Sequence, residues 1–215
     1  MLKEVRKCLY TKDKSKLNIF LNVVIVFVVL VFAVEIAFTL NYSGVYIVHS
    51  SMYPTLTGAD SDDVIGGDYV YVNKHAKPDY GDIVVVYDGK GEYLIKRAIA
   101  FGGDTVRLDK GQLYIKYKGQ TDFTCVEEEY LDPDCNDPNT KKNNFHSDDG
   151  YVVKGGHFFL LGDNRNISLD SRDYGAFPLD NLDGVVTKWS LEHKSFCTAV
   201  YSYFKFQLPS FFGLK

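Results

Sequence analysis

The sequence predicts an all-β domain of partly closed antiparallel sheets, preceded by one N-terminal transmembrane helix. Two observations support this prediction. A long apolar run occupies residues 17–40, and from Val45 onward short runs rich in Val, Ile, Tyr and Phe alternate with glycine-containing turns. Such alternation is typical of strands and hairpins. Beyond the apolar run we find no helical periodicity and no internal repeat, so no further helix is expected.

The first 40 residues are expected to anchor the chain in a membrane. Residues 1–16 contain six Lys or Arg and two acidic residues. Glu35 is the one charged residue among residues 17–40. It lies near the outer end of the run, where a carboxylate can reach water or a headgroup, so no functional role is expected for it. As a helix at about 1.5 Å per residue this run reaches roughly 36 Å, which exceeds the roughly 30 Å of a bilayer core. It is also longer than the apolar core of a cleaved signal. Basic flanks stay in the cytoplasm, so the chain after Leu40 is expected outside.

Charge and cysteine content limit the function classes. Residues 41–215 carry 18 basic and 25 acidic side chains, which argues against electrostatic binding of nucleic acid. The four cysteines form no C-x-x-C pair, which argues against a zinc site or thioredoxin chemistry. Cys125 and Cys135 both lie in the external part, where a disulfide between them is one expectation.

Seven strands are expected, punctuated by glycine, with turn signals such as those at residues 79–82 and 88–91 between them. They cover residues 45–49, 68–74, 82–87, 92–101, 112–118, 157–161 and 184–189.

Two segments depart from the strand pattern. Residues 119–150 hold nine acidic residues and two lysines, and we expect an exposed acidic insertion. The spacing of Asp132, Asp134 and Asn136 is similar to the start of an EF-hand loop, but the glycine and glutamate that follow in such loops are missing, so no calcium site is expected. Residues 196–215 are aromatic but contain Lys205, which makes a second full span doubtful. This tail is expected either at the bilayer interface or packed on the domain.

Three segments carry side chains suited to catalysis. Ser51 follows an expected strand about ten residues beyond the anchor, although a serine in a turn is ordinary. Lys96 shares one strand face with Leu94 and Ala98. It lies either at a solvated edge or in a desolvated site, where the pKa of its amine would fall and make it a base. Residues 162–175 form an unusually polar run, either a surface loop or a braced loop that holds something in place.

Together these segments resemble type I signal peptidases, the serine-lysine enzymes that remove signal peptides at the outer face of the bacterial cytoplasmic membrane. In that family the nucleophile precedes Met-x-Pro-Thr-Leu, as Ser51 does here. The family's lysine stands in a Lys-Arg pair followed by Gly-Asp, matched by Lys96 and Arg97 with residues 103–104. Its last motif, Gly-Asp-Asn with Ser-x-Asp-Ser-Arg, matches residues 162–172. Lysine at position 96 separates the chain from the endoplasmic-reticulum type, which has histidine there.

The resemblance implies a role for each matching residue. Ser51 would be the nucleophile and Lys96 its base, with the Lys96 amine oriented by Ser168. An ion pair between Asp170 and Arg172 would fix the loop. The remaining matches are the supporting residues Asp163 and Arg97, and the substrate-groove residues Val48, His49, Met52, Leu94 and Ile95.

His49 stands where the family has serine or glycine, two residues before the nucleophile. On an extended strand it would share a face with Ser51 and could be a second oxyanion donor beside the Ser51 amide. Alternatively it only packs at the rim of the groove.

The resemblance also implies substrates, location and organisation. Residues 41–195 would be an extracytoplasmic peptidase domain acting on precursors whose signal peptides bear small residues at the first and third positions before the cut. The partners would be these precursors and the lipid bilayer, near the secretion channel, with no metal or organic cofactor. An enzyme dedicated to a few precursors, such as pilin-type ones, would have the same motifs. A catalytically silent binding module would normally have lost Ser51 or Lys96.

Overall fold

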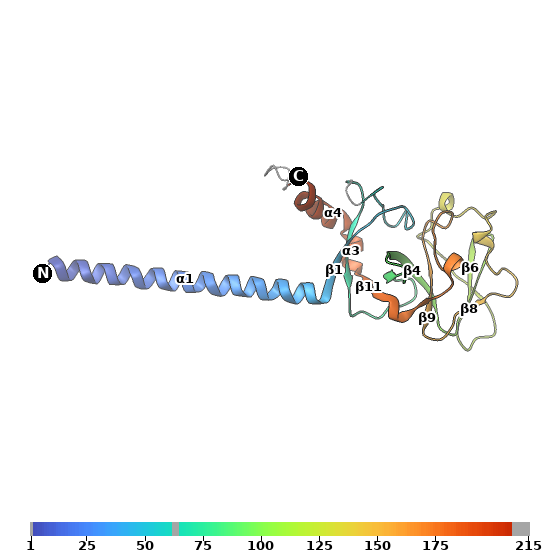
Figure 1. The fold of residues 1–215 in the computed structure, drawn as a ribbon, viewed down its shortest axis with the longest axis horizontal. Coiled ribbons are helices and arrows are strands. Elements are labelled where there is room, and N and C mark those ends of the chain that lie inside the picture. The colour runs from blue at the N-terminus through green and yellow to red at the C-terminus, as the bar shows by residue number, and fades with distance from the viewer. Residues whose placement is uncertain (1, 62–64, 208–215) are drawn as a thin grey trace. The chain divides into compact units, whose positions relative to one another are not determined.

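The computed structural model describes residues 2–61 and 65–207, with side chains placed from residue 16 to residue 205 in these ranges. The chain divides into two compact units, Met1–Tyr42 and Ser43–Lys215. The first unit is the long helix α1 (Leu2–Asn41), and the second contains the strands (Figure 1).

Helix α1 contains the predicted membrane span. Among the described residues, Lys16–Asn41 is the one helical stretch long and apolar enough to cross a membrane, with a mean hydropathy of 3.0 over its best window. Its large apolar side chains are exposed around the whole helix. A helix that is hydrophobic on all sides is suited to a lipid environment. The expected helix at residues 17–40 is therefore present, and it continues toward the N-terminus through the basic segment.

The second unit is mainly antiparallel β-structure, as predicted. A seven-stranded sheet has the order β1-β2-β11-β3-β4-β9-β10 and a four-stranded sheet the order β7-β6-β5-β8. The strands are β1 (Tyr42–Tyr46), β2 (Tyr69–Asn73), β3 (Ile83–Tyr87), β4 (Tyr93–Phe101), β5 (Thr105–Asp109), β6 (Gln112–Lys116), β7 (Thr124–Cys125), β8 (Tyr151–Val152), β9 (His157–Leu161), β10 (Phe177–Pro178) and β11 (Leu182–Val186). Strand β4 pairs with β3 along its first half and with β9 along its second half.

Two apolar clusters matter for the position of the catalytic segments. One contains Val106 and Ile115 from the smaller sheet together with Phe159 of β9. The other contains Met52 and Leu56, both fully buried, against Val70 of β2 and Ile83 of β3. The second cluster anchors the turn that carries Ser51 on the sheet, since burying such side chains contributes about 1.5–3 kcal/mol each.

The segment before Ser51 is not the strand expected at residues 45–49. Strand β1 ends at Tyr46, and His49 has φ +66°, a left-handed conformation outside any extended strand. The His49 N–H donates to the carbonyl of Ala59 at 2.8 Å. A Cβ at Gly58 would lie 1.7 Å from the His49 carbonyl oxygen, so this close approach requires glycine.

The expectation of no helix beyond the anchor was wrong. Besides a short α2 (Ser171–Tyr174) and 3-10 turn η3 (Leu179–Asn181), the described residues end in α3 (Lys188–Glu192), α4 (Lys194–Ser202) and a π-helical turn, η4 (Tyr203–Gln207). The expected strand 184–189 stops at Val186 because the Thr187 side chain caps α3 by accepting from the Ser190 N–H. Tertiary packing holds α4, whose Tyr201 ring stacks on Tyr69 at 4.2 Å. Figure 1 shows α3 and α4 beside β1 and β11.

Residues 119–150, expected as an exposed acidic insertion, have many exposed side chains and also short elements that pack on the domain. They contain β7, which pairs with β6, and two 3-10 turns, η1 (Pro133–Cys135) and η2 (Lys142–Asn144). Asn143 is fully buried, and Phe145 packs on the apolar cluster of the smaller sheet. The segment is therefore exposed along much of its length and is held to the domain at particular residues by apolar contacts and hydrogen bonds.

The predicted disulfide is also absent. Cys125 and Cys135 are both free thiols. Cys125 is exposed on the edge strand β7, whereas Cys135 is buried in η1, where its carbonyl accepts from the Asn166 N–H. The two cysteines therefore belong to separate elements that are held by other contacts.

Candidate active site

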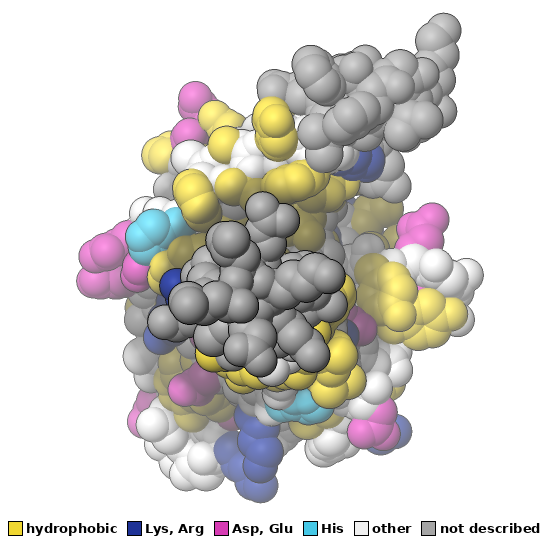
Figure 2. Space-filling view, turned by 90° about the vertical axis from the view of Figure 1, so that its left-hand side faces the viewer, with side chains coloured by type: hydrophobic (Ala, Val, Ile, Leu, Met, Phe, Trp, Pro, Cys, Tyr) yellow, Lys and Arg dark blue, Asp and Glu magenta, His cyan; other side chains and the backbone are white. Residues whose placement is uncertain are grey.

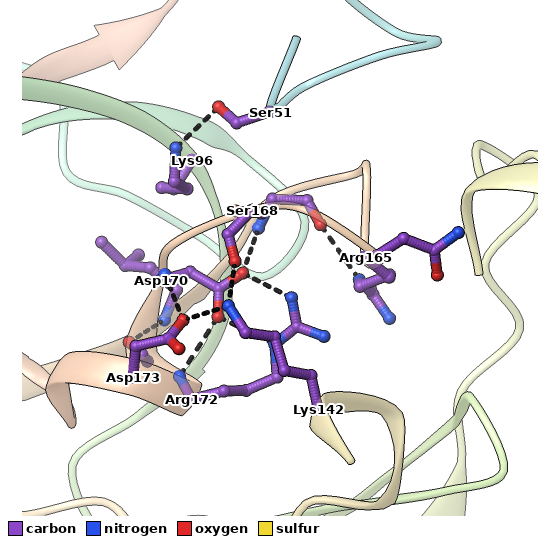
Figure 3. A network of polar contacts seen from close by, with 12 residues as sticks. Ser51, Lys96, Lys142, Arg165, Ser168, Asp170, Arg172 and Asp173 are labelled. Carbon is purple, nitrogen blue, oxygen red and sulfur yellow. Dashed lines mark hydrogen bonds and ion pairs between the residues drawn. The ribbon is translucent and has the colours of Figure 1, made fainter. Parts of the chain in front are cut away.

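Ser51 and Lys96 meet in the structure. The Lys96 Nζ donates hydrogen bonds to the Ser51 Oγ at 2.8 Å and to the Ile95 carbonyl at 2.8 Å (Figure 3). Lys96 comes from β4, opposite Val84 of β3 in the ladder, and only 3% of it is exposed. A hydroxyl and a buried amine at this distance form a nucleophile and base pair.

Burial controls the protonation of Lys96. Desolvation lowers the pKa of its amine, while the negative charges of Asp170 and Asp163 raise it, and the balance lowers the pKa from 10.5 to about 8. A large share of Lys96 is therefore uncharged near pH 8 and able to accept a proton. Of the two sequence alternatives, a solvated edge and a desolvated site, the structure has the second.

The polar run at residues 162–175 is joined directly to the nucleophile turn. The Asn164 N–H donates to the Ser51 carbonyl at 3.0 Å. A Cβ at Gly162 would lie 2.2 Å from the Ser168 Oγ and 2.5 Å from the Ser51 carbonyl oxygen, so only glycine fits between the two segments. This polar run is therefore a braced loop rather than a free surface loop.

Arg97 and Asp163, which were expected only as supporting residues, form a buried ion pair. The Arg97 Nε donates to the Asp163 Oδ1 at 2.8 Å, and its Nη1 donates to the Gly81 carbonyl at 2.8 Å. The Thr55 hydroxyl donates to the same carboxylate. Thr55 was missed as a site residue because nothing in its sequence position indicates a partner 108 residues away.

Asp170 and Arg172 form the predicted ion pair. The Arg172 Nε and Nη2 donate to the two carboxylate oxygens of Asp170 at 2.9 and 2.8 Å. The same carboxylate accepts from the Gly162 N–H and caps α2. Burial alone would raise the pKa of Asp170, but the bonds and charge of Arg172 outweigh it and lower the pKa. Asp170 therefore stays ionised beside Lys96.

Ser168 lies in this loop but does not make the predicted bond to Lys96. Its Oγ is buried and is among the few side-chain atoms of the described residues without a hydrogen-bond partner. In its charged form the Lys96 amine has three donors, and the bonds to Ser51 and Ile95 use two of them, which leaves one donor available.

A groove of about 1020 Å³ opens at the dyad. Of the expected groove residues, Val48, His49, Leu94 and Ile95 line it. Met52 does not, because it is fully buried in the core, so its expected role in substrate binding is not supported.

Sequence reasoning missed four apolar groove residues that are each at least half exposed: Tyr93, Ile167, Leu169 and Tyr174. Three of them stand out as apolar or aromatic residues within the polar run 162–175, which was the available signal.

The groove contains an unpaired strand edge. Strand β4 pairs with β3 from Tyr93 to Arg97, whereas its pairing with β9 begins only at Arg97. On the β9 side, residues 93–96 are therefore open in the described part of the chain. Free backbone groups of this kind can accept an extended peptide as an added strand.

Comparison with known proteins agrees with this site. Residues 19–190 match the family described as signal peptidase, peptidase S26. Signal peptidase I U of Bacillus subtilis (strain 168) is 32% identical over 175 residues, covering 79% of this chain and 84% of that protein. Signal peptidase I S of the same organism is 36% identical over 143 residues, covering 62% and 68%. Signal peptidase I P of Bacillus subtilis subsp. natto is 30% identical over 181 residues, covering 81% and 89%.

The matched region contains both members of the buried serine-lysine pair and the braced loop beside it. The chain therefore belongs to the signal peptidase family, peptidase S26, whose members remove signal peptides with a serine-lysine dyad.

Proposed function

We propose that this chain cleaves signal peptides with Ser51 as the nucleophile and Lys96 as its general base. The observation that carries the proposal is the 2.8 Å hydrogen bond between the Ser51 Oγ and a buried amine whose pKa is lowered to about 8. The uncharged amine takes the hydroxyl proton while the Ser51 oxygen attacks the scissile carbonyl. The resulting Lys96 ammonium gives this proton to the leaving nitrogen, the C–N bond breaks, and the new N-terminal amine departs, which leaves the acyl-enzyme ester and an uncharged Lys96. The same amine then activates a water that hydrolyses the ester.

The surrounding residues support this reaction by position and charge. The Ser51 N–H is one oxyanion donor, and His49 is the candidate for the second, since it lines the groove beside Ser51. Ser168 holds a buried hydroxyl without a partner and can accept the third donor of Lys96 once that amine is protonated. The ion pairs Arg97–Asp163 and Arg172–Asp170 fix the position of the catalytic loop relative to the strand that carries Lys96.

The substrate binds as an added strand. The open edge of β4 at residues 93–96 offers backbone groups to an extended segment before the cleavage site, and the side chains of Val48, Leu94 and Ile95 favour small residues there.

The expected topology places the reaction at the outer face of the bacterial cytoplasmic membrane, near the secretion channel. The six basic residues before the apolar run keep the N-terminus cytoplasmic, and the acidic remainder of the chain is outside. Its net negative charge disfavours nucleic acid as a partner.

The terminal helices are proposed to rest on the bilayer surface. Phe196, Val200, Tyr203 and Phe204 have the spacing i, i+4, i+7 and i+8, and all are exposed, as is Trp189. The opposite face packs on β2, where the Thr198 hydroxyl accepts from the Tyr69 N–H at 2.8 Å. The described part of the tail is therefore proposed to pack on the domain with one face and to contact the bilayer with the other. Figure 2, seen from the left-hand side of Figure 1, shows hydrophobic side chains together with scattered charged and histidine side chains. Aromatic side chains favour the membrane interface.

The test is to incubate the purified full-length protein with a secreted precursor and to sequence the new N-terminus of the product. We expect one cut directly after the signal peptide. Ser51→Ala and Lys96→Met should each lower turnover by roughly 10³-fold or more, because the two groups act in one proton transfer. Both variants should remain folded, so that their melting temperatures stay close to that of the parent. A Lys96→Met variant that turns over like the parent would overturn the assignment of the base.

A further inference from the structure

Residues 126–145, called the bracing segment here, reach the catalytic loop 162–173 through several polar side chains. These are Glu128, Tyr130, Lys142 and Asn143. None of them carried a signal in the sequence, and none is used in the mechanism above. Each contacts the catalytic loop itself or the partner of one of its carboxylates. Figure 3 labels Lys142, which lies near Ser168 and Asp173.

Asn143 completes the hydrogen bonding of Arg172. Its Oδ1 accepts from the Arg172 Nη1 at 2.8 Å, while the Nε and Nη2 of that guanidinium bind Asp170. The Asn143 amide nitrogen donates to the Asp137 carbonyl at 2.8 Å, which fixes which way the amide faces. Asn143 and Arg172 are both buried, so the plane of the guanidinium is set from both sides.

Lys142 holds the backbone of the same loop. Its Nζ donates to the Ser168 carbonyl at 2.9 Å and pairs with Asp173 at 2.7 Å. The Asp173 carboxylate in turn accepts from the Asp170 N–H. Lys142 is therefore connected to Ser168 directly and to Asp170 through Asp173. These are the two loop residues assigned to support Lys96.

Glu128 and Tyr130 contact two arginines near the other carboxylate of the catalytic loop, Asp163. Glu128 pairs with the fully buried Arg165, whose Nε donates to the Gly162 carbonyl at 3.1 Å. The Tyr130 ring lies 3.7 Å from the guanidinium carbon of Arg97, the partner of Asp163. The bracing segment thus contacts the environment of both carboxylates.

We propose that Lys142 and Asn143 are positioning residues for the signal-peptide cleavage, which fix the places of Ser168 and Asp170 in the loop near Lys96 through Arg172 and the loop backbone. The inference rests on the proposed roles of Ser51 and Lys96.

The charges that act on the base make this positioning measurable. Asp163 and Asp170, both from the segment that follows β9, oppose the effect of burial on Lys96. Arg97 on β4 neutralises the first and Arg172 in α2 neutralises the second. If Arg172 loses the anchor that Asn143 provides, the charge of Asp170 is less well neutralised. The ammonium form of Lys96 is then favoured, so the rate rises only at higher pH.

The experiment compares Asn143→Leu with Asn144→Leu in the full-length protein. The two residues are neighbours in η2, and the Asn144 amide nitrogen donates to the Pro138 and Thr140 carbonyls without touching the catalytic loop. We expect Asn143→Leu to lower kcat by roughly 10-fold or more at nearly unchanged KM, and to move the ascending limb of the pH profile to higher pH. Asn144→Leu should leave kcat and the pH profile close to those of the parent protein. Asn143→Asp keeps an acceptor for Arg172 and should recover most of the turnover.

Equal effects of the two leucine substitutions on kcat and on the pH profile would overturn the proposal. If Asn143→Leu does not fold, Lys142→Met decides, because the Lys142 side chain is 29% exposed and its loss should not unfold the domain. That variant should lower kcat several-fold at an unchanged melting temperature, and parental kcat would overturn the proposal. Lys96→Met, measured in parallel, tests the base separately. If the Lys96→Met variant keeps its activity, the proposed function is refuted, whatever the results for the Asn143 variants.

Discussion

At the residue scale, the chemistry depends on one lysine that is buried without an acidic partner of its own. Asp163 and Asp170 each bind an arginine, so neither forms an ion pair with Lys96. Had one of them paired directly with the amine, its charge would have held the pKa of Lys96 near or above the ordinary value. The arginines thus serve the base indirectly, by occupying the carboxylates that would otherwise keep it charged.

His49 provides the residue-scale prediction. Its left-handed backbone, with φ +66°, is favourable for glycine, so His49→Gly removes the imidazole without straining the chain. As the second oxyanion donor, the imidazole should account for roughly 10²-fold in turnover. We expect that loss of kcat in His49→Gly at nearly unchanged KM, and substantial recovery in His49→Ser, whose hydroxyl can donate. Steady-state kinetics on a precursor measures both. Turnover within a few-fold of the parent in His49→Gly would show that His49 only packs at the rim of the groove.

Sequence reasoning at this scale succeeded where the partner lies in the same motif. Asp170 and Arg172 are two residues apart, and their pairing is confirmed. His49 was misplaced because strand alternation was extended past Tyr46, where the backbone turns to satisfy the hydrogen bond with Ala59. Asn143 could not be found at all, because its contact with Arg172 spans 29 residues and depends on the fold of an irregular segment.

At the element scale, α4 shows how packing can decide a helix that periodicity alone did not reveal. Only Cys197 of this helix is buried, and Tyr201 reaches Tyr69 through ring stacking rather than through an aliphatic core. Nine residues are too few for a helix to be stable by itself, so the contacts with β2 are what hold it.

The membrane contact of α3 and α4 gives the element-scale prediction. Trp189 is the single tryptophan of the chain and is about half exposed, so its fluorescence reports on this surface alone. In proteoliposomes we expect brominated lipids to quench Trp189, because the exposed aromatic stripe holds it at the interface. Phe196→Ser should weaken the quenching. Tyr87→Ser, which removes an exposed aromatic side chain from β3, is the matched control and should leave it unchanged. Emission that is insensitive to brominated lipids would contradict the proposed contact.

At the scale of the whole molecule, the long elements followed from the sequence and the irregular ones did not. Strand β9 has the expected bounds, and β2, β3 and β4 differ by at most one residue at each end, because alternation and β-branched residues define them. The acidic composition of residues 119–150 indicated exposure, but it gave no sign of the residues in that segment that contact the catalytic loop. In the structure some of its polar groups bind arginines and a backbone carbonyl of that loop. Such long-range polar pairing leaves no periodic signal.

The dependence of kcat/KM on pH tests the central claim most directly, because it reports the protonation state of the base in the free enzyme. The account predicts a rate that is low at pH 6, rises with unit slope, reaches half of its maximum near the Lys96 pKa of about 8, and levels off above it. The sign follows from the mechanism, since only the uncharged amine accepts the Ser51 proton. A rate that rises through the carboxylate range and is already constant below pH 6 would contradict the account and indicate an acidic side chain as the base.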